Sequence, residues 1–256
     1  MMKTIHTLIF FTGMLLCMAC GEEDYPLYDT TQQDAVFIEY KNANEEIVDT
    51  LDYEFGFNIA TEYKVMIPVR VMGLPADRER SFEVAPVAAE TDMVENVHYS
   101  IEPTVIAANS VQGNIVVHLL RGNDAAIQEK QFTLKLQLKN TEDFRPVGQT
   151  TFRLRFSDIH PERPDWWPAT YVMPPYTYEI AQEFFKYFYM VEEVQPSTFK
   201  TMIDKYGDYF VKAQSLQGPF AMYSSFLAKF VLIPLREYYR VNDPEIYDVF
   251  PKPTLY

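Results

Sequence analysis

Apolar residues between Ala35 and Asp158 recur at every second position, which is the spacing of β-strands that bury one face. Turn-forming residues separate these segments, and none of the stretches between them has the 3.6-residue spacing of a helix. The alternation predicts strands at 36–40, 51–57, 65–71, 82–87, 104–107, 114–120, 132–138 and 152–156. Strands in this number predict an antiparallel Ig-like β-sandwich over residues 35–158.

Pro68 lies within the segment at 65–71 and faces away from its valines. Because proline has no backbone N–H to donate to a neighbouring strand, we expect this segment to be an edge strand or to carry a bulge. The disulfide and partnering tryptophan of antibody domains are absent from residues 35–158. The expected sandwich is therefore not of the antibody type.

Residues 159–176 form a proline-rich linker, with five prolines between Pro161 and Pro175. Such a density of proline excludes both a regular helix and a central strand. Beyond the linker the apolar spacing changes to 3.6 residues, which indicates helices. More than half of the aromatic side chains lie in residues 162–256, so we interpret residues 177–256 as a small α-helical domain with an aromatic core.

Three helices are predicted in this domain, at 177–194, at Phe199–Tyr206 and, longer, from Phe220 to Val231. Ser197 is the expected N-cap of the second helix and Gly207 its expected end. Pro234 should kink or end the third helix, because its ring clashes with the preceding turn.

The first 19 residues have the features of an export signal. Lys3 is followed by an apolar run, Leu8–Leu16, about half as long as a bilayer crossing requires. Ala19 then precedes Cys20, which resembles the lipobox of bacterial lipoproteins, where the chain is cut before a cysteine that carries lipid. We therefore predict a signal peptide at 1–19 and lipidation of Cys20. A plain secretory signal that is cut elsewhere is the alternative.

Cleavage before Cys20 leaves a mature chain with no second cysteine, so we expect no disulfide, no cysteine-based zinc site and no thiol nucleophile. Cys17 is the weaker candidate for lipidation because bulky leucines precede it. Loss of Lys3 changes the formal net charge from −14 to −15, and so acidic a chain is a poor match for nucleic acid. Residues 20–34 are polar and are predicted to form a flexible tether.

Several stretches together resemble a family of Bacteroidota surface lipoproteins to which no activity is assigned. They are LDYEFGFN, VMIPVRVMGLPADRERSFEV, FTLKLQLKNTEDFRPV, FRLRFSD and RPDWW. The resemblance implies an Ig-like or Calx-β-like sandwich followed by a helical part. It also implies that the chain works beside a SusC-like transporter and a SusD-like lipoprotein in nutrient uptake. The acidic run Gly21–Asp24 resembles the signal that exports such lipoproteins to the outer face of the outer membrane.

No catalytic or metal-binding motif accompanies this architecture. The histidines of the mature chain, His98, His118 and His160, lie far apart in sequence and have no zinc-binding spacing. No nucleophile elbow and no glycine-rich phosphate loop is present, so we expect a non-enzymatic protein without a cofactor or metal.

Carboxylates spaced by one helical turn leave a surface hydrolase as an alternative. The pairs are Glu179 with Glu183 and, if that stretch were helical, Asp158 with Glu162. Such pairs are more often a solvated helix face than a catalytic dyad.

Trp166 and Trp167 are adjacent in the linker, where their flat faces could stack on sugar rings or on peptide side chains. The alternative is that they fill the gap between the two domains. Tyr187 and Tyr189 lie off the apolar stripe of the first helix and are candidates for contact with a ligand or partner protein.

The leading hypothesis is a lipid-anchored protein on the cell exterior, accessory to a SusC/SusD-like importer, that binds an oligosaccharide or peptide or supports the complex. A structural subunit without a ligand is the alternative from a different class. Exposed tryptophans in a groove would favour binding, and a flat apolar helical face would favour assembly.

Overall fold

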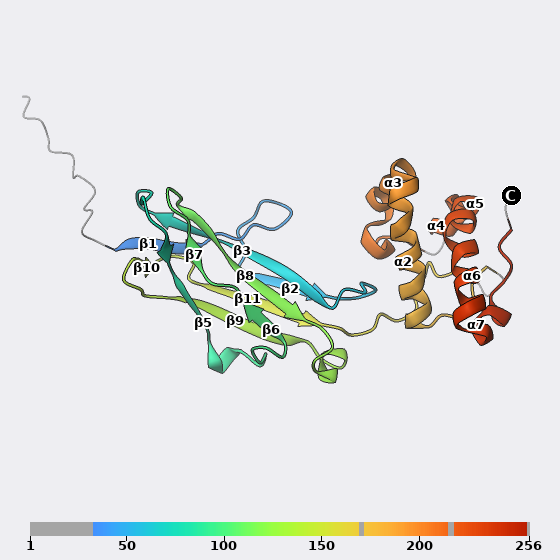
Figure 1. Ribbon diagram of the computed structural model, residues 1–256, viewed down its shortest axis with the longest axis horizontal. Helices are drawn as coiled ribbons and strands as arrows, with labels where there is room; N and C mark the ends of the chain where they lie inside the picture. The colour runs from blue at the N-terminus through green and yellow to red at the C-terminus, as the bar shows by residue number, and fades with distance from the viewer. Residues whose placement is uncertain (1–32, 169–171, 215–217, 255–256) are drawn as a thin grey trace, which may run out of the picture.

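The computed structural model describes residues 33–168, 172–214 and 218–254. Cys20, the predicted signal peptide and most of the predicted tether lie outside these residues. Two β-sheets form the first half of the described chain, and helices form the second (Figure 1). The helices lie beyond one end of the sheets, whereas the first strand begins at the opposite end (Figure 1).

The two sheets have separate strand orders. The larger follows the order β10 (Phe144–Pro146), β1 (Asp34–Ile38), β3 (Glu62–Met72), β8 (Gln112–Leu120), β7 (Val105–Ile106) and β4 (Arg80–Ser81), with β6 (Tyr99–Ile101) also paired to β8. The smaller follows the order β2 (Thr50–Glu54), β11 (Thr151–Ser157), β9 (Phe132–Lys139) and β5 (Glu83–Pro86).

The predicted sandwich with a following helical part is confirmed. Most strand pairs are antiparallel as expected, but β1 with β10 and β2 with β11 are parallel. Each parallel pair joins an early strand to a late one, and hydrophobic alternation carries no information about such pairing. The strands β4, β6 and β10 were not predicted because two or three residues are too short to show alternation.

The prediction that the Pro68 strand lies at an edge is wrong, because β3 lies between β1 and β8. The carbonyl of Pro68 accepts a hydrogen bond from the backbone N–H of Glu39, 3.0 Å away. Because the nitrogen and the carbonyl of one residue point to the same neighbouring strand in an antiparallel pair, the Pro68 nitrogen also faces β1. That neighbour, β1, ends at Ile38, one residue before Glu39. The N–H that proline lacks would therefore point just beyond the last residue of β1, so the strand pair loses little free energy from its absence.

The core of the sandwich comes from alternate positions of the long strands. On β3 and β8 the inward residues are fully or almost fully buried, and their neighbours are not. This arrangement is what period-two alternation predicts. The largest side chains of this core include Phe55, Phe144, Phe152 and Phe156.

The first two predicted helices are confirmed. Helix α2 (Tyr178–Val194) begins at Thr177, whose hydroxyl accepts a hydrogen bond from the backbone N–H of Ile180 at 3.2 Å. Helix α3 (Pro196–Tyr206) ends at Gly207 as expected. Ser197 does not cap it, because the helix begins at Pro196 and the N-cap position is Gln195, two residues before Ser197.

The third predicted helix is broken into short pieces. They are α4 (Pro219–Met222), α5 (Ser224–Leu227), a π-helical turn (Ala228–Leu232) and α6 (Ile233–Asn242), followed by α7 (Pro244–Val249). Pro234 does not end the helical path. The widened π turn stands directly before α6, in which Pro234 is the second residue, and so provides a local way to accommodate the proline.

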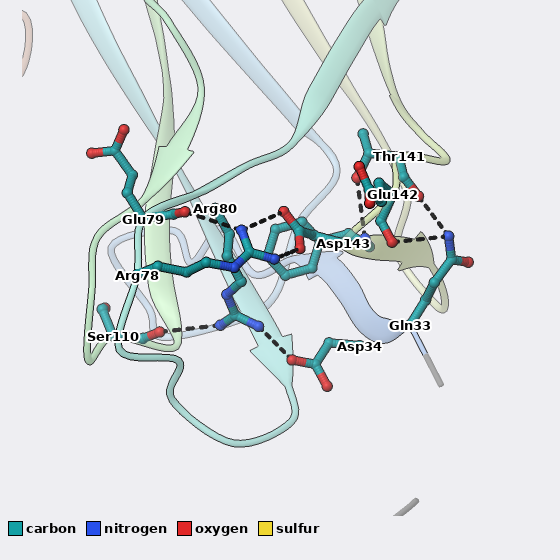
Figure 2. Close-up of polar contacts among 10 residues, drawn as sticks. Gln33, Asp34, Arg78, Glu79, Arg80, Ser110, Thr141, Glu142 and Asp143 are labelled. Atoms are coloured by element: carbon teal, nitrogen blue, oxygen red, sulfur yellow. Dashed lines mark hydrogen bonds and ion pairs between the residues drawn. The ribbon is translucent and has the colours of Figure 1, made fainter. Parts of the chain in front are cut away.

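The first strand is held by polar side chains at the far end of the sandwich (Figure 2). Arg80, 5% exposed, donates to the carboxylate of Asp34 at 2.5 Å, and its guanidinium lies 4.9 Å from the centre of the Phe144 ring. Beside it, Arg78 pairs with Asp143, and the Gln33 amide donates to the carbonyl of Thr141 at 2.6 Å. These contacts tie the start of β1 to the segments on both sides of it.

Candidate ligand cleft between the sandwich and the helices

Phe57 links the two parts although it lies in the strand-rich half of the sequence. Gly56 has a φ of +52°, which lets the chain turn away after β2. The Phe57 ring then lies 5.1 Å from that of Phe185 and 6.1 Å from that of Tyr178, both on α2. With 6% exposure, Phe57 belongs to the core of the helical part rather than to that of the sandwich.

Arg121 forms the polar side of the same joint. Its guanidinium binds both oxygens of Asp158, at 2.6 and 2.8 Å, and donates to the Tyr178 hydroxyl at 2.6 Å. It also donates to the carbonyls of Asn58 and Ala60. The Tyr178 hydroxyl in turn donates to the carbonyl of Gly56 at 2.8 Å. The ends of β8 and β11, the loop after β2 and the start of α2 therefore meet at one largely buried guanidinium group.

Trp166 and Trp167 are buried, with 5% and 3% exposure, so they do not form the open pair of faces considered from the sequence. The Trp166 ring packs 5.3 Å from Phe210 and 5.7 Å from Phe185. The two indoles instead occupy the aromatic core of the helical part, which is the space-filling alternative.

A cleft of about 840 Å³ opens beside this joint. One wall comes from the end of β2 and the start of β3, another from the linker, and a third from α2 and the short 3₁₀ turn Asp208–Phe210. Its aromatic lining comes from Tyr53, Phe55, Phe57, Tyr63, Trp166, Tyr189, Tyr209 and Phe210. A volume of this size fits a ligand of several sugar units or amino-acid residues.

Two tyrosine pairs shape the walls. The rings of Tyr53 and Tyr63 stack with centres 3.7 Å apart and planes 8° from parallel, and Tyr63 is 38% exposed. Opposite, the Tyr189 hydroxyl donates to Asp208 at 3.3 Å and accepts from the backbone N–H of Tyr209. Burial raises the pKa of Tyr209 to about 12 and raises that of Tyr189 too, so both hydroxyls are protonated at neutral pH.

Carboxylates surround the opening of the cleft. Glu54, Glu162, Asp165 and Asp208 line it and are solvent-exposed. Among the residues that the structure describes, the lining contains no lysine, arginine or histidine. The cleft therefore combines apolar aromatic faces with hydrogen-bond acceptors that carry negative charge.

The remaining candidates from the sequence are spread over several places. Tyr189 lines the cleft, whereas Tyr187 is half-buried and packs 6.1 Å from the Tyr238 ring. Glu183 forms an ion pair with Lys186 at 3.1 Å.

The second carboxylate pair, Asp158 with Glu162, lies in irregular chain rather than on a helix. Asp158 is bound by Arg121, and Glu162 lines the cleft.

The three histidines have separate partners. His98 is 2% exposed, accepts from the backbone N–H of Val94 at 2.8 Å and lies 3.0 Å from Asp124. His118 contacts Glu102, and His160 stacks on Tyr178 with ring centres 3.6 Å apart. Within the described ranges no group of three or more His, Cys, Asp or Glu side chains could hold a metal ion. None of the helices described there has the length and apolarity needed to span a membrane.

Sequence reasoning missed the lining residues Tyr53, Tyr63 and Tyr209. The first two stand in strands, where a tyrosine is ordinary, and Tyr209 lies between two predicted helices. Tyr209 is distinguished by its backbone, which has a φ of +52°, a value that is uncommon outside glycine. This backbone angle is seen only in the structure, so no sequence signal identifies Tyr209.

Solved structures that are similar to part of this chain include two from Bacteroides. A two-domain protein of unknown function from Bacteroides fragilis is 10% identical with a TM-score of 0.37, and the match covers 51% of this chain and 47% of that one. A putative carbohydrate-binding protein from Bacteroides ovatus is 12% identical with a TM-score of 0.35, and the match covers 48% and 37%. This chain thus spans less than half the length of either structure.

No curated protein matches the chain. A family model described as a domain of unknown function, DUF4843, matches residues 28–187, from before the first strand to within helix α2. This match covers more than half of the sequence and includes the strands, the linker and the first turns of α2. The chain belongs to the DUF4843 family.

Proposed function

We propose that this protein is a lipid-anchored protein on the outer face of the outer membrane that captures an oligosaccharide or a peptide for a SusC/SusD-like importer. The observation that carries the binding role is the aromatic, acid-rimmed cleft. Cys20 is the proposed lipid attachment, and the SusC-like transporter and SusD-like lipoprotein are the proposed partners. The protein acts by binding rather than by catalysis.

The composition of the cleft supports capture of an extended ligand. Aromatic faces such as that of Tyr63 gain free energy by covering apolar ligand surface, while carboxylates accept hydrogen bonds from hydroxyl or amine groups. The Arg121 joint supports a fixed geometry for the walls, which lowers the entropic cost of binding.

A structural subunit of the same importer is the second candidate. It is favoured by apolar side chains that remain exposed on the helical part, at Met190, Val194, Val211, Met222 and Val241, with exposures from 59% to 76%. Packing against a partner protein would remove such side chains from water.

Two measurements test the proposal. Purification from the native outer membrane in mild detergent, followed by mass spectrometry, should recover the transporter and its lipoprotein together with this chain. Titration of the full mature chain with oligosaccharides and peptides should change the fluorescence of its two tryptophans, because Trp166 lines the cleft.

Tyr63→Ala should weaken the binding about tenfold, the loss of one stacking contact of roughly 1.4 kcal/mol. Tyr247→Ala is the control, because Tyr247 is half-buried on α7 and does not line the cleft. Recovery of a lone lipoprotein, or equal affinities of the two variants, would contradict the proposal.

A further inference from the structure

We infer that the cleft recognises a positively charged peptide, one that carries lysine or arginine side chains and binds in an extended conformation. This inference rests on the proposed function, since it assumes that the cleft is a ligand site. It narrows the proposed ligand from oligosaccharides and peptides in general to cationic peptides.

The charge of the cleft is the first argument. Among the described residues, no ion pair involves Glu54, Glu162, Asp165 or Asp208, although such pairs are frequent elsewhere on the surface. The part of the lining that the structure describes carries these four negative charges and supplies no cation. A cationic ligand would supply that compensation, and an anionic ligand would be repelled.

The balance of donors and acceptors is the second argument. The Asn58 amide is engaged within the protein: it donates to the Tyr53 hydroxyl at 3.3 Å and accepts from the backbone N–H of Ala60 at 2.9 Å. The Tyr189 hydroxyl is likewise committed to Asp208. The described lining therefore offers charged acceptors, whereas its remaining donors are neutral hydroxyls such as those of Tyr53, Tyr63 and Tyr209. Ammonium and guanidinium groups only donate, whereas every sugar hydroxyl also has an oxygen that seeks a donor.

The aromatic walls are the third argument, because the face of an aromatic ring attracts cations. This molecule already uses such contacts: the Arg121 guanidinium lies 4.9 Å from the centre of the Phe55 ring at the back of the same joint. In the cleft, Tyr63 presents an exposed ring within a lining that also holds Glu54. An aromatic face beside an unpaired carboxylate suits an ammonium or guanidinium group.

The position of β2 favours a peptide over an amino sugar. Strand β2 is an edge of the smaller sheet, and its last residues, Tyr53 and Glu54, line the cleft. The carbonyl of Asp49 accepts from Arg153 and the N–H of Phe55 donates to Ser157, so the odd-numbered residues point their backbone groups toward β11.

The backbone N–H and C=O groups of successive strand residues point to opposite sides, so those of Asp52 and Glu54 point to the open edge of the sheet. An extended peptide can pair with such an edge by backbone hydrogen bonds and then continue into the cleft.

The test is a fluorescence titration of the full mature chain with peptides of equal length and β-propensity, alternating threonine with lysine, glutamine or glutamate. Hexamers of glucosamine and of glucose serve as the sugar arms. The lysine peptide should bind at least tenfold more tightly than the glutamine peptide, and the glutamate peptide should not bind. Raising the salt concentration from 50 to 300 mM should weaken the binding of the lysine peptide severalfold.

The double variant Glu162→Gln with Asp165→Asn should lose about tenfold in affinity for the lysine peptide. Its matched control is Glu237→Gln with Glu245→Gln, which removes the same two charges from exposed positions on α6 and α7 outside the cleft. Equal affinity of the two double variants would overturn the inference.

A sugar hexamer that binds more tightly than the lysine peptide would overturn the inference. If Tyr63→Ala abolishes that sugar binding, the proposed capture function still stands. The absence of any ligand whose binding depends on Tyr63 would contradict both.

Discussion

Arg121 connects the ends of two sandwich strands, the loop after β2 and helix α2 through one guanidinium group. Its side chain is 12% exposed and that of its partner Asp158 is 4% exposed. A charge pair at this depth has lost most of its hydration, so each charge is stabilised mainly by the other. The planar guanidinium also reaches acceptors on several segments at once, a geometry that an ammonium group cannot reproduce.

Arg121→Ala is therefore expected to lower the free energy of unfolding by about 3–5 kcal/mol, because it leaves the Asp158 carboxylate buried without a counter-charge. Arg155→Ala is the matched control. It breaks a similar bidentate pair with Asp52 whose side chains are 41% and 51% exposed, and it should cost at most about 1 kcal/mol. Urea denaturation of both variants measures the difference, and equal shifts of the midpoint would contradict the structural role given to Arg121.

At the scale of single elements, the ends of the helices are set by residues with special backbones. Gly207 ends α3 with a φ of +73° and a ψ of 171°, a conformation that is essentially restricted to glycine. A Cβ at this position would lie 3.2 Å from Cγ2 of Val211. The turn that follows places Asp208 and Tyr209 in the lining of the cleft, so the end of this helix also positions part of that lining.

Gly207→Ala should accordingly lower the free energy of unfolding by about 1–3 kcal/mol through backbone strain. Lys200→Ala on the same helix is the control, since its ion pair with Asp204 is exposed and its loss should cost at most about 0.5 kcal/mol. Thermal denaturation monitored by circular dichroism compares the two. A Gly207→Ala variant as stable as Lys200→Ala would show that this position does not need glycine.

Elements with a long regular pattern were predictable from the sequence, and elements specified by contacts were not. The alternation of β9 and β11 and the apolar stripe of α2 each extend over several turns or pleats, so one face is defined before any packing is known. The parallel partner of β2 depends instead on a strand about a hundred residues later. The cleft was unpredictable for the same reason, because its walls come from β2, the linker and α2.

At the scale of the whole molecule, Phe57 makes the two parts dependent on each other. It follows β2 in the sequence but completes the aromatic core around α2. An isolated sandwich would expose this ring to water, and an isolated helical part would contain a cavity in its place.

Phe57→Ala should lower the free energy of unfolding by about 3–5 kcal/mol and separate the unfolding of the two parts. Tryptophan fluorescence follows the helical core, where both indoles lie, and far-ultraviolet circular dichroism follows the whole chain. The two transitions should coincide in the unmodified protein and diverge in the variant. Ile59→Ala, at a position that is 55% exposed, should leave them coincident. Coincident transitions in Phe57→Ala would contradict the coupling.

Strand β1 also determines how the molecule responds to force. It is hydrogen-bonded on both sides, parallel to β10 and antiparallel to β3, and the chain enters it at the end of the sandwich that lies farthest from the helices (Figure 1). A pull between the N-terminal segment and the cleft therefore runs along the strand axis and loads both ladders in shear, so that many hydrogen bonds must break together. If the chain is anchored and binds a ligand as proposed, a force that draws the ligand away would be resisted first at β1.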